Sequence, residues 1–344
     1  MVGLCHRRMT STRITSSAIV SDGIAVTGDA DGGSIIWSFD SNAPRPKLVQ
    51  EAALRSWTTY YHGITTITIS PDLAWLFMGS DDKTGILWQV IRDPDSVTAK
   101  AFFKLRSGEG EIICSAFSPD GRLLAVGDEA GASVWLPGQI IPSSRKMYEE
   151  DFRLETRDLY YDATCVAFLP DSRSVVVGYS LRQIRVWNIT SSDPTKSRSR
   201  LRGVLRSLLI EHPEGPGTGT SAVEAVAASP SGTRLLSACG NGTVVWWDVT
   251  PDEISHSIMA VDGHATAVGF DTEATGWVAW GTGALELWDW TSKVTIRRSG
   301  ATQLPEWGDH EYLSSVTKDG TWALALGHEG FGSLALWRLR DVKG

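Results

Sequence analysis

The residues best able to do chemistry in this chain are not spaced as in any common catalytic signature. A Gly-x-Ser-x-Gly elbow, a His-Glu-x-x-His pair and a Gly-Lys phosphate loop are all absent, which removes the usual motifs of hydrolases, zinc proteases and nucleotidases. The stretch GDADGG (28–33) resembles half a calcium loop through Asp29 and Asp31. It lacks the third ligand and the distal glutamate of such a loop, so we interpret both aspartates as turn residues. We therefore expect no catalytic residue, no cofactor and no metal site.

The cysteines and the N-terminal composition bear on the cellular compartment. Cys5, Cys114, Cys165 and Cys239 are far apart and form no Cys-x-x-Cys pair, so we interpret them as reduced thiols of a cytoplasmic protein. Residues 1–21 contain three arginines, many hydroxyl residues and no acid. That composition also fits a mitochondrial transit peptide, which stays open as the alternative.

The charge balance narrows the classes of partner. The formal net charge of −8 argues against general binding to nucleic acid or membrane, because both need a basic face. No apolar run is long enough to span a membrane. At 344 residues and 42% hydrophobic composition, the chain has enough apolar material for a large core.

Tryptophan is unusually frequent, with 15 copies, and several of the tryptophans end a shared pattern. In GNGTVVWWDV (240–249), a turn is followed by an alternating strand that runs to Trp247. The same pattern recurs at intervals of 41 residues (247 to 288) to 60 residues (187 to 247), ending at Trp37, Trp88, Trp135, Trp187, Trp247, Trp288 and Trp337.

A second shared unit precedes each of these tryptophans. It consists of an apolar strand, a turn such as SPDG (118–121), and another apolar strand. In that turn proline presets φ, aspartate caps the backbone and glycine adopts the left-handed conformation. Each unit therefore predicts a four-stranded sheet, which cannot bury both faces alone but can do so between two neighbours in a radial array.

This pattern resembles the WD40-repeat family and covers nearly the whole chain. The resemblance implies an all-β fold, a seven-bladed β-propeller of four-stranded antiparallel blades, as a single domain over residues 1–344. Only RLRDVKG follows Trp337, too short for a turn and a full strand. The family closes its ring with an N-terminal strand, so we expect residues 3–10 to complete the last blade.

The repeats depart from the family pattern. Trp247-Asp248 and Trp288-Asp289 alone keep the name-giving pair. Family members often carry Gly-His before the first strand and an aspartate in the turn before the tryptophan, which join a buried hydrogen-bond network. The resemblance implies such a structural role here, most completely in the second repeat, for His62, Ser80, Asp82, Trp88, His264, Trp288 and Trp247.

Two surface features are candidates for partner binding. The loops between repeats are rich in aromatic side chains, which dominate interface hot spots unless they pack beneath their own loops. The segment 196–220 interrupts the repeat, and its residues 200–206 fit an outer strand better than a partner-binding helix. The candidate aromatic rim comprises Trp57, Tyr60, Tyr61, Tyr160, Tyr161 and Trp307, and the basic segment comprises Lys196, Arg198, Arg200, Arg202 and Arg206.

These features predict a non-catalytic protein-interaction scaffold or adaptor that is a subunit of a larger assembly. Its partners would be proteins or peptides rather than nucleic acid or membrane. A propeller that binds a small molecule or catalyses a reaction at the mouth of its channel is the alternative. Association with RNA or a ribonucleoprotein through the basic segment is a third hypothesis, disfavoured by the net charge.

Overall fold

The computed structural model of the protein describes most of the chain, in separate stretches. They are residues 2–10, 12–20, 22–43, 46–55, 62–94, 96–107, 110–139, 152–154, 162–191, 201–211, 213, 222–249, 254–261, 264–280, 285–299, 311–317, 321–327 and 332–338.

In this described part the fold is all-β, with seven four-stranded antiparallel sheets that we number in chain order. Sheet 1 contains β2 (Ile14–Val20), β3 (Ile24–Asp29), β4 (Gly33–Ser38) and β5 (Val49–Arg55). Sheet 2 contains β6 (Ile64–Ile69), β7 (Trp75–Ser80), β8 (Thr84–Asp93) and β9 (Ser96–Arg106). Sheet 3 contains β10 (Ile112–Phe117), β11 (Leu124–Asp128), β12 (Gly131–Trp135) and β13 (Phe152–Leu154). Two 3₁₀ turns, η1 (Pro137–Gln139) and η2 (Ser180–Arg182), are the helical elements described.

The remaining sheets repeat the same order. Sheet 4 contains β14 (Ala163–Phe168), β15 (Ser174–Tyr179), β16 (Gln183–Ser191) and β17 (Leu201–Glu211). Sheet 5 contains β18 (Val223–Ala228), β19 (Arg234–Cys239), β20 (Thr243–Val249) and β21 (Ile254–Val261). Sheet 6 contains β22 (Ala265–Phe270), β23 (Thr275–Trp280), β24 (Leu285–Asp289) and β25 (Val294–Ser299). Sheet 7 contains β26 (Glu311–Val316), β27 (Trp322–Gly327), β28 (Gly332–Arg338) and β1 (Val2–Thr10).

Sheet 7 draws its strands from both ends of the chain. Strand β1 pairs antiparallel with β28, with Val2 opposite Arg338 and Thr10 opposite Gly332. Residues 3–10 therefore lie in the strand that the shortness of the C-terminal tail predicted. Because β28 would otherwise be an edge with unpaired backbone groups, β1 supplies the fourth strand of that sheet.

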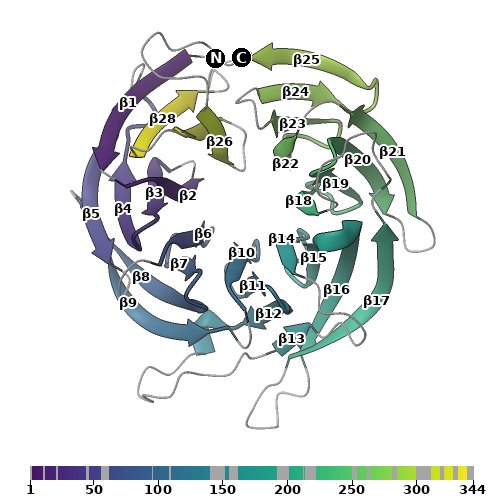
Figure 1. Ribbon diagram of the computed structural model, residues 1–344, viewed down its shortest axis with the longest axis horizontal. Helices are drawn as coiled ribbons and strands as arrows, with labels where there is room; N and C mark the ends of the chain where they lie inside the picture. Colours follow the sequence, from purple (N-terminus) through teal and green to yellow (C-terminus); the bar gives the residue numbers. More distant parts are fainter. Residues whose placement is uncertain are drawn as a thin grey trace.

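The sheets stand around a common centre, with the first strand of each innermost (Figure 1). We call the four strands of a sheet a, b, c and d from the centre outward, so β2, β6 and β10 are a strands. Each a strand contacts the a strand of the next sheet, and β26 contacts both β22 and β2. Because neighbouring strands are antiparallel, the b–c turns and d–a connections lie at one end of the strands, and the a–b and c–d turns lie at the other. We call these two ends the two faces of the arrangement.

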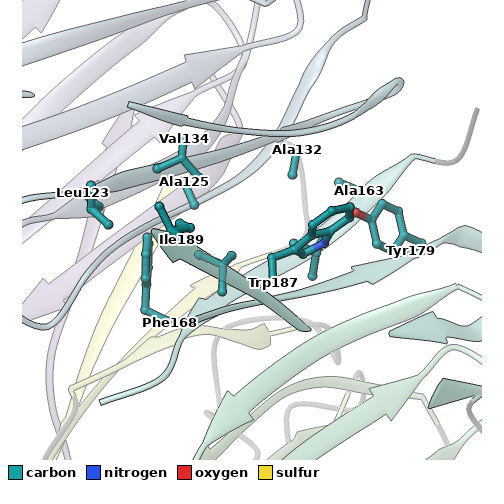
Figure 2. Packing of buried hydrophobic residues seen from close by; sticks show 11 residues of the cluster. Leu123, Ala125, Ala132, Val134, Ala163, Phe168, Tyr179, Trp187 and Ile189 are labelled. Carbon is teal, nitrogen blue, oxygen red and sulfur yellow. The ribbon is translucent and has the colours of Figure 1, made fainter. Parts of the chain in front are cut away.

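Apolar side chains fill the space between neighbouring sheets. One buried cluster joins sheets 3 and 4, where Leu123 and Val134 face Phe168 and Ile189 (Figure 2). Similar clusters join sheets 1 and 2, 2 and 3, 4 and 5, 5 and 6, and 7 and 1. A single sheet thus buries both faces only through its neighbours, which accounts for the continuous buried runs of strands such as β11 and β15.

Tryptophans outside the repeat pattern also serve this packing. Trp246 contacts Trp290 at 6.0 Å between ring centroids, and Trp288 stacks on Trp290 at 5.9 Å. Trp322 of sheet 7 packs edge-on against Phe39 of sheet 1 at 5.2 Å. Offset and edge-on aromatic pairs add to the energy of burial, so the unusual tryptophan content serves the core between sheets.

A series of polar contacts joins the a strands near the centre. Each donor lies on one sheet, and each acceptor is the carbonyl of the residue that opens the a strand of the next sheet. Thr15 Oγ1 donates to the carbonyl of Ile64 (2.6 Å), and Thr65 Oγ1 donates to that of Ile112 (2.5 Å). The same contact recurs from Cys114 Sγ to the Ala163 carbonyl (3.3 Å) and from Thr164 Oγ1 to the Val223 carbonyl (2.6 Å).

The a–b turns follow the chemistry expected from the SPDG sequence. Ser118 Oγ donates to Asp120 Oδ1 (2.6 Å), the Gly121 amide donates to the Ser118 carbonyl (2.9 Å), and Gly121 adopts φ +72°. A residue with a Cβ is disfavoured at that φ. Over the described stretches, no helix has the length and hydropathy needed to cross a bilayer.

Candidate functional site

The b–c turns of sheets 1, 2, 3 and 5 are held by a polar side chain in the turn. Asp29 Oδ1 accepts the amides of Asp31 (3.0 Å) and Gly33 (2.8 Å). Asp82 Oδ1 accepts the Thr84 amide (2.9 Å), and Asn241 Oδ1 is used in the same manner by Thr243. A short side chain that captures backbone amides two residues later fixes the turn. Asp29 therefore acts as a turn residue, as the sequence predicted.

The same face of sheets 1 to 3 carries a group of carboxylates that we call the acidic arc. Asp31, Glu111 and Glu129 are exposed. Glu129 Oε2 accepts the amide of Glu111 (3.3 Å), so the d–a connection and the b–c turn of sheet 3 lie side by side. The arc comprises Asp29, Asp31, Asp81, Asp82, Glu111, Asp128, Glu129 and Asp162.

The pKa of one carboxyl group shows the effect of neighbouring negative charge in the arc. The pKa of the Asp162 carboxyl is raised, first by its partial burial and second by the neighbouring Glu129. Like charges close together disfavour the ionised form. The described basic residues on this part of the face are Arg13, Arg55, Lys83 and Arg106. Carboxylates outnumber them, and the arc therefore has a negative potential that would attract a basic ligand.

Asp128 is a buried aspartate that stabilises the b–c turn of sheet 3. Its side chain is 3% exposed, Oδ1 accepts the Ala130 amide (2.8 Å) and Oδ2 accepts the Ser107 hydroxyl (2.5 Å). Buried charge is tolerated when hydrogen bonds replace its hydration. The turn that presents Glu129 is thus anchored from below.

The repeat tryptophans divide according to the residue on strand b. Trp37 Nε1 donates to Thr27 Oγ1 (3.0 Å), and Trp247 Nε1 donates to Ser237 Oγ (2.8 Å). In both sheets the acceptor lies diagonally across the strand pair and ten positions earlier in sequence. The diagonal neighbour of a tryptophan on the same sheet face is within reach of its ring.

In other sheets this diagonal position is apolar. It holds Met78 diagonal to Trp88 and Val177 diagonal to Trp187, and neither indole nitrogen has a hydrogen-bond partner in the described part of the chain. Trp288 instead uses a residue on its own strand, because its Nε1 donates to Glu286 Oε2 at 2.9 Å. A buried N–H without a partner costs about 1–3 kcal/mol, so these sheets rely on apolar packing.

The residues proposed for the network of the second repeat are dispersed. Trp88 is buried without an indole partner, whereas His62 is partly exposed and its Nδ1 lies 3.0 Å from Asp81 Oδ1. Ser80 Oγ accepts the Asp82 amide at 3.3 Å, and Asp82 also caps the turn through Thr84. The structure therefore brings Ser80 and Asp82 together but does not connect them to Trp88.

The histidine before sheet 6 lies in a different environment. His264 Nε2 is 3.8 Å from Glu224 Oε1, with both side chains partly exposed near the centre. This pair is separate from the indole of Trp288, which uses Glu286. Among the tryptophans predicted to join a hydrogen-bond network, Trp247 donates its indole N–H to a hydroxyl, that of Ser237.

The predicted partner surfaces fall mostly outside the described residues. This applies to Lys196, Arg198 and Arg200, and to the whole aromatic rim of Trp57, Tyr60, Tyr61, Tyr160, Tyr161 and Trp307. Arg202 and Arg206 lie on β17, where Thr190 pairs with Arg202. Residues 201–211 therefore form an outer strand, as the alternation of residues 200–206 favoured over a partner-binding helix.

Sequence reasoning missed two features of this face. The acidic arc could have been found by listing the acids at the b–c turns. Leu181 is 56% exposed at the b–c turn of sheet 4, and Leu181 and Arg182 have φ of 64° and 63°. Such values are uncommon for residues with a Cβ, and no glycine or asparagine at that turn signals them.

The described residues contain no group of three or more histidine, cysteine, aspartate or glutamate side chains arranged to hold a metal ion. Cys114, Cys165 and Cys239 are the thiols whose side chains are described, and none of them is in a disulfide. Burial raises the pKa of Cys114 to about 12 and that of Cys165 well above its usual value. A thiol that stays protonated is a poor nucleophile.

Comparison with known families agrees with this architecture. The model described as WD domain, G-beta repeat matches residues 54–89, 160–188 and 209–248. These ranges end at or next to the c-strand tryptophans of sheets 2, 4 and 5. The chain carries WD40 repeats.

Two curated relatives match part of the chain. Apoptotic protease-activating factor 1 of Rattus norvegicus is 25% identical over 172 residues, 48% of this chain. Protein HIR1 of Yarrowia lipolytica is 29% identical over 143 residues, 32% of this chain. The match covers 13% of the length of each relative, so the chain corresponds to a small part of either protein.

Proposed function

We propose that the WD40 repeats form a closed seven-bladed propeller, a single domain over residues 1–344, that acts as a non-catalytic interaction scaffold in a larger assembly. Two observations support the closed ring: β1 completes sheet 7, and β26 contacts both β22 and β2. Such a ring presents a wide, rigid platform to peptides or other subunits. The proposed location is cytoplasmic.

The acidic arc is the observation that carries this proposal. Its carboxylates stand on turns fixed by backbone hydrogen bonds, such as those at Asp29 and Asp128. A preordered surface loses little entropy when a partner binds. We therefore expect a protein partner that presents a basic segment, with an association rate that falls as ionic strength rises.

The aromatic rim belongs to the same proposal. In the sequence its residues follow the outer strand of one sheet and precede the inner strand of the next, and they lie outside the described part of the chain. Aromatic anchors surrounded by charged residues would combine affinity with steering. The rim comprises Trp57, Tyr60, Tyr61, Tyr160, Tyr161 and Trp307.

The test is affinity purification with mass spectrometry on charge-reversal variants. Asp31→Lys combined with Glu111→Lys changes two exposed carboxylates of the arc. The matched control is Asp22→Lys combined with Asp93→Lys, two exposed carboxylates at the a–b and c–d turns of the other face. We expect the arc variant to lose partners that the wild type and the control retain. Equal recovery by all three proteins would place the partner elsewhere.

A small-molecule or catalytic site at the channel mouth remains the second candidate, and the His264–Glu224 pair near the centre is the feature that favours it. His264→Ala would then abolish binding of a ligand while leaving partner recovery intact. RNA binding through the basic segment is the third candidate. Nuclease treatment before purification would remove the recovered proteins in that case and would leave them in the first.

A further inference from the structure

The b–c turn of sheet 4 differs from the other turns of its length. In sheets 1, 2 and 5 three residues join strands b and c, and the middle residue is Asp31, Asp82 or Asn241. In sheet 4 the middle residue is Leu181. Asp82 and Asn241 each accept the backbone amide of the residue two positions later, and leucine has no oxygen with which to do so. The position that elsewhere stabilises the turn is therefore apolar here.

The backbone of this turn is also strained. Leu181 has φ 64° and ψ 36°, and Arg182 follows with φ 63°. In sheets 2 and 5 the left-handed residue is the third of the turn, Lys83 or Gly242, which is the usual form of a three-residue loop. In the left-handed region the Cβ of a leucine comes too close to the following carbonyl oxygen. Leu181 therefore makes this turn less stable than asparagine or glycine would.

Packing within the protein does not account for this leucine, because its side chain is 56% exposed. The other large apolar side chains that are exposed in the described part of the chain lie elsewhere. Val49, Ile91 and Val294 are at or near c–d turns on the other face, and Ile258 lies within β21. Backbone strain that serves neither the turn nor the core is typical of residues that bind something outside the chain.

The acidic arc reaches this turn through contacts across sheets 3 and 4. Glu129 Oε2 accepts the amide of Glu111 at 3.3 Å. Partial burial, and then the charge of Glu129, raise the pKa of Asp162. The Asp162 carbonyl in turn accepts the amide of Ser180, the residue before Leu181, at 3.0 Å. Leu181 therefore stands at the sheet 4 end of the arc.

We infer that Leu181 is an apolar anchor for a protein partner whose basic segment carries an apolar side chain beside its lysine or arginine residues. The inference rests on the proposed function, in which the acidic arc attracts that basic segment. Charge steers the segment toward the arc in many arrangements, whereas contact with Leu181 fixes which of its residues lies at sheet 4. A segment with the same charge and no apolar side chain would bind more weakly, because it buries less apolar surface.

The experiment measures the binding of two synthetic peptides to the whole protein by fluorescence anisotropy. Both peptides alternate lysine and arginine, and one has leucine at its centre where the other has serine. We expect the wild type to bind the leucine peptide about tenfold more tightly than the serine peptide. Leu181→Asn should bind the two peptides equally. The matched control is Val294→Thr, which changes a side chain of equal exposure (56%) on the other face and should keep the preference for leucine.

The arc variant, Asp31→Lys combined with Glu111→Lys, separates this inference from the proposed function. It should weaken the binding of both peptides and keep the preference for leucine. Equal binding of the two peptides by the wild type, or an unchanged preference in Leu181→Asn, would overturn the inference and leave the proposed function in place. Wild-type affinity of the arc variant for both peptides, or binding of neither peptide by the wild type, would overturn both.

Thermal unfolding gives a second readout. Asparagine tolerates the left-handed conformation, and its side chain can accept the amide of Gln183 as Asn241 accepts that of Thr243. We expect Leu181→Asn to raise the melting temperature by about 2 °C while it removes the preference for the leucine peptide. A fall in the melting temperature would show that the fold needs Leu181 for packing, and that result would also overturn the inference.

Discussion

Installing a hydroxyl beside an unpaired tryptophan should restore a hydrogen bond that sheet 4 lacks. Trp187 Nε1 is buried with no partner in the described chain, and Val177 occupies the diagonal position on strand b. The same position holds Thr27 in sheet 1 and Ser237 in sheet 5, at 3.0 and 2.8 Å from the indole nitrogen. Val177→Thr is close to isosteric, so it places the hydroxyl there with little change in packing.

The size of the expected change in stability follows from two energetic penalties. Burying a hydroxyl without a partner costs about 1–3 kcal/mol, and an unpaired indole N–H carries a penalty of similar size. Val177→Thr joins the two groups and removes both penalties. Val176→Thr is the matched control, because Val176 is equally buried at 0% exposure but packs in the cluster on the opposite face of the sheet. We expect the two variants to differ by about 2 kcal/mol in free energy of unfolding.

Urea denaturation measures this difference. The slope of unfolding free energy against urea concentration must be the same in the wild type and both variants. A change in the midpoint then reports a change in stability. We expect Val177→Thr to unfold at or above the wild-type midpoint and Val176→Thr to unfold below it. If Val177→Thr is destabilised as much as Val176→Thr, the diagonal rule for the indole acceptor is refuted.

Three further predictions concern strand β1, a paired tryptophan and a thiol. Deleting residues 2–10 should lower the melting temperature of the protein, because β28 loses its partner strand; an unchanged melting temperature would contradict this role. Ser237→Ala should lower the free energy of unfolding, measured with denaturant, by about 1–2 kcal/mol, because the Trp247 N–H loses its acceptor. Ser237→Thr keeps a hydroxyl acceptor and should retain most of the wild-type stability. Cys114 should resist alkylation in the native protein near pH 8. Rapid labelling of Cys114 at that pH would contradict this prediction. Since its folded pKa of about 12 lies above its unfolded value of 9.0, its contribution to stability is present below pH 9 and is lost as the pH rises toward 12, a decline that Cys114→Ala should reduce.

The repeat could be read from the sequence because the fold repeats a local chemistry. Turn residues such as those of SPDG (118–121) act within four positions, and each c strand ends at a tryptophan. The extra strand of sheet 7 was predictable from the short tail after Trp337. Strand β17 was predictable from the alternation of residues 200–206, because sheet 4 needed a fourth strand.

The hydrogen-bond network was not predictable by the same route. Histidine and aspartate in the second repeat suggested a full network around Trp88, yet the acceptor for an indole lies on the neighbouring strand. Met78 fills that position, so the network cannot form there. Reading the residue ten places before each tryptophan would have selected Thr27 and Ser237. The acidic arc assembles turns from several repeats, and its members are distant in sequence.

The polar contacts between a strands share one direction. From Thr15 through Thr164, sheets 1 to 4 each donate to the sheet that follows, as subunits do in a head-to-tail contact. A repeat of this kind carries both halves of its own joint. Gene duplication could therefore add or remove a unit without inventing a new interface.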